Sequence, residues 1–411
     1  MRIGVIGGGG AGLTTAWLLE EHHDVMLFER DERLGGHAHT VDVEVDGQRL
    51  QVDAGFEFFG GSTYPTFTRL LDAIGVPRRS YPATFTLTGG GGSIVLPPVR
   101  GGMPAWRSLG PASVAHLLRL RRFAAGIPAF MLAHDTSITM REHLDRLRLP
   151  PSFRDEFLVP FLLGFWCVEL DEFLETSAYN TLFYLAAMTG WRAPMQFEID
   201  GGMRTYVDAL TRDLRRTDVR VACGIRRISR PPGGFAIDDA RGRTHEFDQI
   251  VLAAPADFAA ELLTGVPGLE ERTTQLRRFE FFDAVIAIHG DRRLMPPRER
   301  DWSVVNSRWD GAHSQLSIWK PTRGLPLFRS WVTYEERMPE PLHELVRYRH
   351  GRGTPAHFEA QRRLAAMQGE HGVWLAGMYA DDADSHESAV HSAVTVAERL
   401  APESRRLGML R

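Results

Sequence analysis

The sequence RIGVIGGGGAG, residues 2–12, decides the fold. It begins as a short apolar strand and runs into the pattern Gly7-x-Gly9-x-x-Gly12, after which the apolar spacing is that of a helix. A second apolar strand, residues 24–28, completes a βαβ unit. A glycine pattern placed between a strand and a helix in this way predicts a Rossmann-type α/β domain that binds a dinucleotide.

Glu29 ends the second strand of this unit. Its carboxylate can accept a hydrogen bond from a ribose 2′-hydroxyl and would repel a 2′-phosphate. The first glycine permits the tight turn, the second lets a pyrophosphate approach the backbone, and the third lets helix and strand pack closely. The helix N-terminus then faces the phosphates with the positive end of its dipole. We therefore expect NAD or FAD at this turn rather than NADP.

A second glycine turn, Gly35-Gly36, follows Glu29. An Asp-Gly pair further on predicts a hairpin over residues 41–52, and Asp53 lies directly after it. A domain that binds only NAD has no need of a second glycine turn. The second turn therefore distinguishes this segment from a domain that binds only NAD.

These motifs resemble those of the flavin-containing amine oxidase and phytoene desaturase superfamily. The resemblance continues in Gly201-Gly202 before a helix, in the returning strand 248–255, and in 373–377 followed by Ser385-His386-Glu387. A closer resemblance, to the bacterial "predicted NAD/FAD-binding protein" subgroup, rests on residues 35–40, 63–65, 204–206 and 289–296. The resemblance implies an FAD-dependent oxidoreductase whose terminal helix points its N-terminus at the flavin.

The composition along the chain changes between two kinds of segment. Nucleotide-domain character is found in residues 1–75, 200–270 and 366–411, which we assign to a discontinuous FAD-binding domain. The remaining segments, 76–199 and 271–365, we assign to a substrate-binding domain. The expected fold is therefore an amine-oxidase-like Rossmann domain interrupted by a mixed, largely helical domain.

The spacing of apolar residues predicts the helices and strands of the second domain. Helical spacing covers residues 113–133, 139–147 and 153–188, and apolar runs at 281–289 and 328–334 predict strands. In the nucleotide domain we expect a helix over 203–216, strands over 219–228, 234–238 and 244–253, and a terminal helix over 388–400.

Three departures from the family pattern stand out. His37 follows the Gly-Gly turn where amine oxidases usually have arginine, which weakens the phosphate contact or makes it pH dependent. Residues 279–288 contain no lysine where many members hold one near the flavin, and Lys320 is the only lysine in the chain. The C-terminal segment has no cysteine to which a flavin could be attached, so we expect noncovalent FAD.

Candidate site residues follow from the motifs and the resemblance. For the cofactor we assign Gly7, Gly9, Gly12, Glu29, Arg30, Gly35, Gly36, His37, Gly60, Gly61, Ile225, Gly377 and Glu387. As candidate catalytic residues we assign His386, Glu387 and Tyr64, although His386 and Glu387 could instead serve to cap the helix. For a substrate pocket we assign Trp166, Trp319 and Tyr334. The pair His37 and His39 has no acidic or thiol companions at ligand spacing, so we expect no metal site.

Three functions fit these features. The first is hydride transfer, of dehydrogenase or desaturase type, between FAD and a hydrophobic small molecule such as a lipid, isoprenoid or secondary metabolite. This function is favoured by the missing amine-oxidase features and by the aromatic-rich, largely helical character of the substrate-binding domain. The second is an amine or amino-acid oxidase that releases hydrogen peroxide, and the third is a flavin-binding partner protein without turnover of its own. Oxygen or a redox partner would accept the electrons in the catalytic cases.

Composition limits the partners of the protein. A net charge of −4 offers no electrostatic basis for binding nucleic acid. The cysteines, Cys167 and Cys223, are far apart in sequence, as in a reduced cytoplasmic protein without a disulfide framework. No apolar run approaches the roughly 18 residues of a membrane span. We therefore expect a cytoplasmic protein, and the sequence leaves its oligomeric state open.

Overall fold

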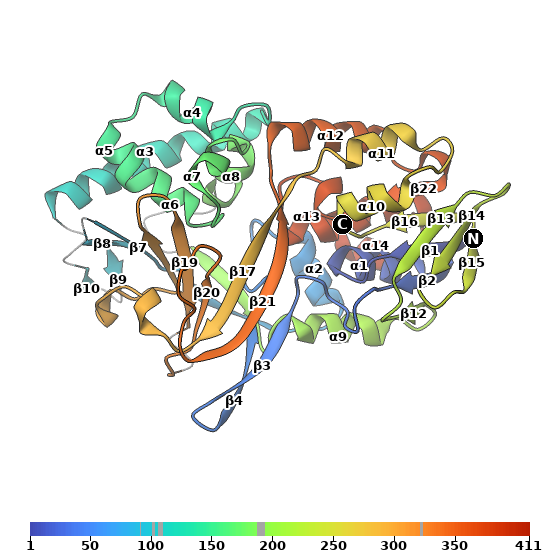
Figure 1. Cartoon of the computed structure of the whole chain (residues 1–411), viewed down its shortest axis with the longest axis horizontal. Helices are drawn as coiled ribbons and strands as arrows, with labels where there is room; N and C mark the ends of the chain where they lie inside the picture. Colours follow the sequence, from blue (N-terminus) through green and yellow to red (C-terminus); the bar gives the residue numbers. More distant parts are fainter. Residues whose placement is uncertain (91, 101–102, 106–109, 187–193, 321–323) are drawn as a thin grey trace.

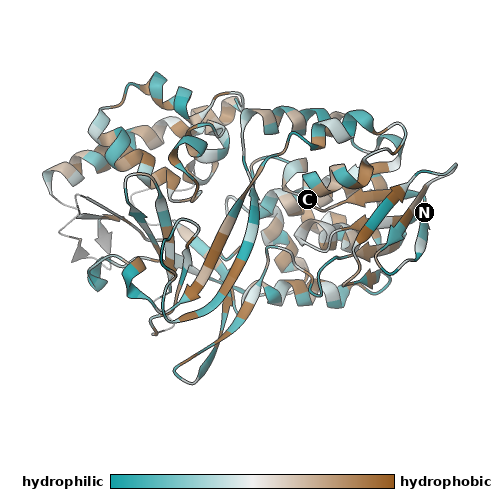
Figure 2. Ribbon diagram, in the orientation of Figure 1, coloured by the Kyte–Doolittle hydropathy of each residue, from teal (hydrophilic) through white to brown (hydrophobic). Residues whose placement is uncertain are grey.

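A parallel sheet of five strands forms one half of the molecule in the computed structural model, which describes residues 1–90, 92–100, 103–105, 110–186, 194–320 and 324–411. The strand order is β12-β2-β1-β16-β22, and each neighbouring pair is parallel. Most of its strand residues are hydrophobic (Figure 2), as expected of a sheet covered on both faces. The strands are β1 (Arg2–Ile6), β2 (Asp24–Phe28), β12 (Asp218–Arg220), β16 (Gln249–Leu252) and β22 (Val373–Leu375).

Helices cover one face of this sheet, and a small antiparallel sheet and further helices cover the other. Val5 faces a core shared with the first group, whereas Ile6 faces the second. The first group comprises α1 (Gly10–Leu19), α2 (Pro65–Ala73), α9 (Arg204–Asp213), α13 (His386–Leu400) and α14 (Arg405–Leu410). The second comprises β13 (Ile225–Ser229), β14 (Phe235–Asp239), β15 (Thr244–Phe247), α10 (Ala256–Leu263), α11 (Glu270–Leu276) and α12 (Pro355–Ala366).

A seven-stranded sheet forms the other half, in the order β21-β17-β20-β19-β18-β7-β8. A group of helices packs on it, with Phe85 and Leu316 of the sheet meeting Phe157 and Phe161 of the helices in one core (Figure 1). The strands are β7 (Phe85–Gly89), β8 (Gly92–Leu96), β17 (Phe281–His289), β18 (Val305–Trp309), β19 (Ser314–Trp319), β20 (Phe328–Trp331) and β21 (Leu342–Gly351). The helices are α3 (Pro111–Ala133), α4 (Met140–Leu147), α5 (Pro151–Phe153), a π-helical turn (Arg154–Leu158), α6 (Val159–Leu163), α7 (Leu170–Leu174) and α8 (Ala178–Ala186).

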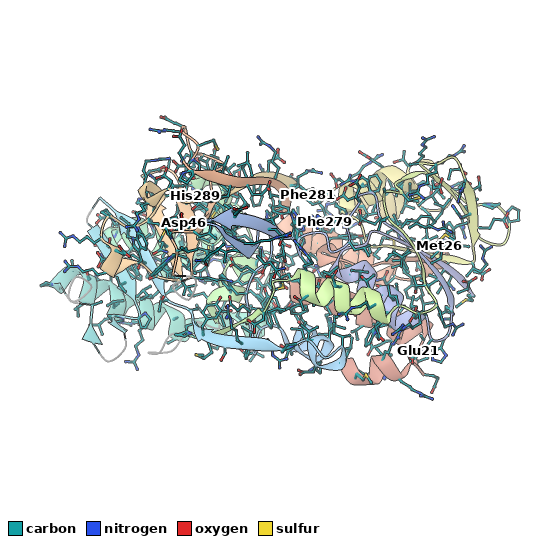
Figure 3. All side chains as sticks on the ribbon, turned by 90° about the horizontal axis from the view of Figure 1, so that it is seen from below. Glu21, Met26, Asp46, Phe279, Phe281 and His289 are labelled. Atoms are coloured by element: carbon teal, nitrogen blue, oxygen red, sulfur yellow. The ribbon has the colours of Figure 1, made fainter. Side chains whose placement is uncertain are left out.

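The long strands β17 and β21 run through the middle of the molecule, between the two halves (Figure 1). Figure 3 shows Phe279 and Phe281 near the centre and His289 further toward the second sheet, whereas Met26 lies in the opposite half. Smaller elements complete the fold: the hairpin β3 (Thr40–Val45) and β4 (Gln48–Asp53), the sheet of β5 (Phe59–Gly60), β11 (Met195–Ile199) and β6 (Arg78–Pro82), and the pair β9 (Val99–Arg100) and β10 (Met103–Pro104). Within the described ranges, no helix is long and apolar enough to cross a membrane.

Several expected elements are confirmed. The βαβ unit, the hairpin and the strand over 281–289 lie where the sequence predicted them. The hairpin turn at Asp46 and Gly47 has positive φ at both residues, as an Asp-Gly turn between paired strands requires. The fold is an α/β fold with a mixed second half, as expected.

Two expected strands are wrong as single elements. Residues 219–228 divide into β12 and β13 because Ala222, with φ of 48°, turns the chain between two different sheets. Residues 244–253 divide at Asp248, which separates antiparallel β15 from parallel β16. The sequence analysis also did not predict β21, α10, α11 or α12.

Candidate functional site

The turn between β1 and α1 owes its shape to glycines that leave no room for a side chain. A Cβ atom on Gly7 would lie 2.5 Å from the carbonyl oxygen of Ala253, and one on Gly12 would lie 1.8 Å from the carbonyl oxygen of Gly7. Gly9 is different, because the nearest atom to its Cβ position is Gly36 Cα at 4.0 Å. The N-terminus of α1 has no side-chain cap. Its backbone N–H groups and the space beside Gly9 are therefore available to an anionic ligand.

Glu29 lies at the rim of this turn. One carboxylate oxygen accepts a hydrogen bond from the backbone N–H of Gly8 at 2.7 Å, and the other accepts from Asp31 N–H at 2.8 Å. These bonds fix the carboxylate while leaving lone pairs for a ribose hydroxyl. Arg30 and Ile225 were also assigned to the cofactor. The Arg30 side chain is exposed, whereas Ile225, the first residue of β13, is buried in the core.

The second glycine turn lies directly against the first. Gly35 N–H donates to the carbonyl oxygen of Gly8 at 2.8 Å, and Gly35 forms a parallel bridge with Gly9. Gly35 and Gly36 have φ of 107° and 57°, values that favour glycine. A Cβ atom on Gly36 would lie 3.3 Å from Gly9 Cα. The two turns therefore form one cradle, which we call the glycine cradle (residues 7–12 and 33–36).

Arg33 belongs to the glycine cradle and was missed by the sequence analysis. Its Nη1 atom is buried and has no hydrogen-bond partner among the residues that the structure describes. A buried guanidinium nitrogen without an acceptor is costly, and a phosphate or ribose oxygen would supply one. The sequence signal that could have identified Arg33 is its position as a basic residue between Glu29 and the second glycine turn. Open space beside Gly9 and an unpaired guanidinium nitrogen fit a bound dinucleotide.

His37 leaves the glycine cradle and packs against β21. Its ring centroid lies 5.0 Å from that of Tyr348 and 5.2 Å from that of His350. Burial lowers the pKa of His37, and the Arg33 guanidinium lowers it further. Burial is also the main reason that the pKa of His350 falls to about 3. Both imidazoles are therefore neutral at pH 7.

The segment after the hairpin passes close beneath His37. A Cβ atom on Gly55 would lie 2.0 Å from the carbonyl oxygen of His37. The assigned residues Gly60 and Gly61 pack instead near Thr63 and against Phe197 of β11, whose side-chain atoms lie 2.9 and 2.8 Å from the two Cβ positions. In the described parts of the chain, no group of three or more histidine, cysteine or acidic side chains is arranged to hold a metal ion.

Glu387 caps a helix, but not its own. Its two carboxylate oxygens accept hydrogen bonds from the backbone N–H groups of Thr66 at 2.7 Å and Phe67 at 2.9 Å, in the first turn of α2. Ser385 caps the helix that contains Glu387, because its hydroxyl oxygen accepts from Ser388 N–H. Glu387 therefore ties the N-terminus of α13 to α2. Gly377, with φ of 140°, precedes this region and donates its N–H to Ser392 Oγ at 2.8 Å.

His386 lies between the N-termini of α1 and α13. A Cβ atom on Gly10 would lie 2.7 Å from His386 Cε1, and His386 Nε2 is 3.0 Å from the Tyr206 hydroxyl oxygen. The imidazole stacks on Phe56 with ring centroids 4.5 Å apart and meets Phe67 edge-on at 4.9 Å. Burial lowers the pKa of His386 to about 3. It is a neutral, aromatic-packed imidazole that touches the start of the glycine cradle.

Tyr64, which is buried, belongs to a polar group that also includes the half-buried residues Tyr184 and Asp384, and we call this set the Asp384 group. The side chains of Tyr64 and Tyr184 are hydrogen-bonded, and the Tyr184 hydroxyl donates to the carbonyl oxygen of Asp384 at 2.6 Å. Burial raises the pKa of the Asp384 carboxyl to about 7. Asp384 precedes α13, and its Oδ2 lies 3.7 Å from the Cβ position of Gly351 at the end of β21. The sequence analysis missed Asp384, since an aspartate before a helix looks like a capping residue.

The three assigned pocket residues do not come together. Trp166 packs edge-on against Tyr184 at 5.8 Å, lines a small pocket with Phe282 and Arg352, and has a buried indole N–H without a partner in the described chain. Trp319 instead packs on Trp302 at 5.1 Å in a separate apolar cluster. Tyr334 stacks on His313 with centroids 4.2 Å apart. Of these, only Trp166 adjoins the Asp384 group.

Lys320 lies in a buried ionic cluster. Its ammonium is 2.7 Å from Glu57 Oε1 and also contacts the Glu198 carboxylate. Arg329 binds the other oxygen of Glu57 at 2.9 Å, and Arg79 binds Glu198 at 2.5 Å. Lys320 is therefore engaged by two carboxylates and lies within this cluster.

Comparisons with known proteins agree with this geometry. The model of the flavin-containing amine oxidoreductase family matches residues 11–351. Carotenoid phi-ring synthase from Streptomyces griseus is 25% identical over 309 residues, which cover 67% of this chain and 56% of that protein. The chain therefore spans little more than half the length of this curated relative.

Solved structures show the same fold at low identity. Putrescine oxidase (a double mutant) superposes with a TM-score of 0.70 at 14% identity, covering 98% of this chain and 100% of that one. Cyclohexylamine oxidase from Brevibacterium oxydans gives 0.66 at 17%, and a CLA-producing fatty acid isomerase from P. acnes gives 0.67 at 17%; each covers 97% of this chain and 99% of its own.

Proposed function

This chain belongs to the flavin-containing amine oxidoreductase family and is an FAD-dependent oxidoreductase, and we propose that it dehydrogenates or desaturates a hydrophobic small molecule. The observation that carries this proposal is the aromatic packing around His386 at the N-terminus of α13. There Phe56 and Phe67 pack on the neutral imidazole of His386, and Tyr64 packs on Phe56. Such a wall suits a lipid, isoprenoid or other apolar substrate better than a charged one.

FAD, when bound, supplies the acceptor for a hydride or electron pair. Gly7, Gly9, Gly12, Gly35 and Gly36 would provide the backbone approach for its pyrophosphate, Glu29 would accept from the adenosine ribose, and Arg33 would pair with an anionic or hydroxyl oxygen. We further propose the domain division expected from the sequence, with residues 1–75, 200–270 and 366–411 holding FAD and residues 76–199 and 271–365 holding the substrate. Noncovalent attachment, a cytoplasmic location and the acceptor, oxygen or a redox partner, stay predictions.

Asp384 is the group best suited to handle a proton. A carboxyl with a pKa of about 7 can both release and accept a proton at neutral pH, as a general acid or base must. The hydrogen-bonded pair Tyr64 and Tyr184 holds the backbone beside it. We therefore assign proton transfer to Asp384 in place of Glu387, whose oxygens are engaged by α2, and give His386 the task of positioning.

Amine oxidation is the second candidate. It is favoured by the shared fold with putrescine oxidase and cyclohexylamine oxidase, and by an acidic group, Asp384, near an aromatic wall that could hold a cation. Family membership supports an enzyme over the noncatalytic flavin-binding partner that was considered from the sequence.

Anaerobic reduction of the bound flavin tests these alternatives. One sample of the purified holoprotein is denatured, and release of FAD into the supernatant is expected for a noncovalent cofactor. A second, native sample is titrated without oxygen with a carotenoid, an unsaturated fatty acid, putrescine and cyclohexylamine while flavin absorbance is recorded. Bleaching by the apolar compounds alone supports the first function. Bleaching by the amines, with peroxide formed on admitting air, supports the second, and no bleaching by any of them counts against both.

A further inference from the structure

Residues 73–134 contain no aspartate or glutamate. The chain has 52 acidic residues among 411, a frequency that would place about eight in a run of 62 residues. The same run contains seven arginines. Three of them, Arg119, Arg121 and Arg122, lie on helix α3, and all three are exposed. This helix, which itself has no acidic residue, therefore gives the molecule a positively charged surface despite the negative net charge of the chain.

The outer face of α3 is also apolar. Leu132 is 88% exposed, Leu118 57% and Val114 37%, and Ala125 and Ala129 are exposed between them. With about 100° per residue, the five side chains fall on one stripe of the helix, which Arg121 interrupts between Leu118 and Ala125. Val114 and Leu132 are 18 residues apart, so the stripe is about 27 Å long. Most helices expose their polar side, and this one exposes an apolar side together with its arginines.

The inner face of α3 packs the helix onto the rest of the protein. Phe123, Ala124 and Ile127 are buried in the core beneath the helix. His116, on the same inner face, stacks on Phe157 with ring centroids 5.3 Å apart and is near Glu156, an acidic residue of the neighbouring π-helical turn. The apolar residues of the outer stripe are therefore in excess of what packing needs. Figure 1 places α3 at the end of the molecule opposite the parallel sheet.

We infer that the outer face of α3 docks the protein onto an anionic phospholipid bilayer. An amphipathic helix that lies in the membrane interface inserts its apolar side chains at the headgroup boundary and uses arginines to attract anionic lipids. Here Leu118 and Leu132 would insert, and Arg119 and Arg122 would contact headgroups beside the stripe. This inference concerns location and does not depend on which substrate the enzyme oxidises.

A second copy of this chain is a poorer occupant of the surface. In a symmetric dimer the same patch meets itself, which would bring the arginines of the two copies together without an acidic residue of α3 between them. An acidic protein would satisfy the arginines, but it would also need an apolar surface matched to a stripe about 27 Å long. A fluid bilayer accommodates exposed apolar side chains without a matching shape.

Vesicle co-sedimentation of the holoprotein tests the inference. Vesicles of phosphatidylcholine alone are compared with vesicles of equal parts phosphatidylcholine and phosphatidylglycerol. We expect binding to the anionic vesicles that weakens with added salt, and little binding to the neutral ones. Arg119→Glu/Arg122→Glu should reduce partitioning at least about 25-fold, since each basic residue contributes about fivefold. Leu118→Asp/Leu132→Asp should also abolish binding.

Matched controls carry the same changes elsewhere on the surface. Leu342→Asp/Met409→Asp alters two residues that are 42% and 54% exposed on β21 and α14, and Arg300→Glu/Arg337→Glu alters two exposed arginines. Both should bind like the unaltered protein, and all variants should retain FAD and their melting temperature. Failure of the unaltered protein to bind anionic vesicles at low salt overturns the inference. An equal loss of binding in the control variants also overturns it. The inference fails as well if the protein is a dimer in the absence of vesicles and Leu118→Asp/Leu132→Asp converts that dimer to a monomer.

Discussion

The glycine cradle and the region around the N-terminus of α13 are built in different ways. In the cradle, the backbone makes the site: Gly9 leaves open space, Gly36 lies close against Gly9, and Gly12 packs without a side chain. Around α13, side chains from distant segments make the site: Phe56 stacks on His386, and the Tyr184 hydroxyl donates to the carbonyl oxygen of Asp384. A cofactor site formed by the backbone is found wherever a chain has its glycine motif. A substrate site formed by side chains can instead change one residue at a time.

Gly12→Ala should break the cradle outright. The added Cβ would lie 1.8 Å from a carbonyl oxygen of Gly7, so α1 must move away from β1. We expect a loss of at least about 3 kcal/mol of unfolding free energy, measured by denaturant titration of the apoprotein. Gly9→Ala is the matched control: its methyl group enters open space, so stability should hold while FAD affinity falls. Equal destabilisation by both changes would contradict the distinction.

Arg33→Gln should separate binding from folding within the cradle. It removes a guanidinium whose Nη1 is buried and unpaired in the described chain, so the stability of the apoprotein should be unchanged or higher. If Arg33 pairs with the dinucleotide, the Kd for FAD should rise about 10- to 100-fold, as measured by fluorescence titration. The exposed neighbour Arg30 provides the control, and Arg30→Gln should have a smaller effect on FAD binding. An unchanged Kd in the Arg33 variant would remove it from the site.

Asp384→Asn tests the region around the N-terminus of α13 through the pH dependence of stability. The folded pKa of about 7 lies above the ordinary 3.8, so the folded chain holds the proton more tightly than the unfolded chain. The contribution of Asp384 to stability is full below pH 3.8 and is lost as pH rises through 7. Relative to the uncharged asparagine variant, the wild type should lose about 1.4 kcal/mol per pH unit within this window.

The measurement is a denaturant titration of both proteins across the pH range. Asp171→Asn, at a side chain that is 91% exposed, should leave the pH dependence unchanged. A constant difference between the wild type and Asp384→Asn would show that this carboxyl is ionised in the folded protein. In the holoprotein, the same variant should remove an ionisation near pH 7 from the rate of flavin reduction if Asp384 transfers the proton.

Glu387→Gln should have the smallest effect. The amide keeps one acceptor oxygen, so only one of the two N–H groups at the start of α2 loses its partner. We expect a loss of about 1 kcal/mol in thermal or denaturant unfolding, and little change in the rate of flavin reduction. Glu398→Gln, on the same helix and exposed, is the control. A large fall in the rate with unchanged stability would return Glu387 to the catalytic candidates.

The N-terminal motif determined much of the protein by itself. Residues 2–28 specify strand, turn and helix through local periodicity and glycine spacing, and these signals need no distant partner. For the same reason the hairpin over 41–52 and the strand over 281–289 were predictable, and the FAD-dependent oxidoreductase class followed from the motifs that resemble the family.

Only the tertiary structure decided the rest. Strand β21 alternates weakly between polar and apolar residues, and most of its residues are only partly buried where it runs between the two halves. Glu387 was assigned to the flavin, but packing of α13 on α2 directs it to Thr66 and Phe67. Asp384 and Arg33 acquire their character from burial, which depends on chain segments far away in sequence. Backbone conformation is encoded locally, whereas the environment of a side chain is set by whatever the completed fold brings beside it.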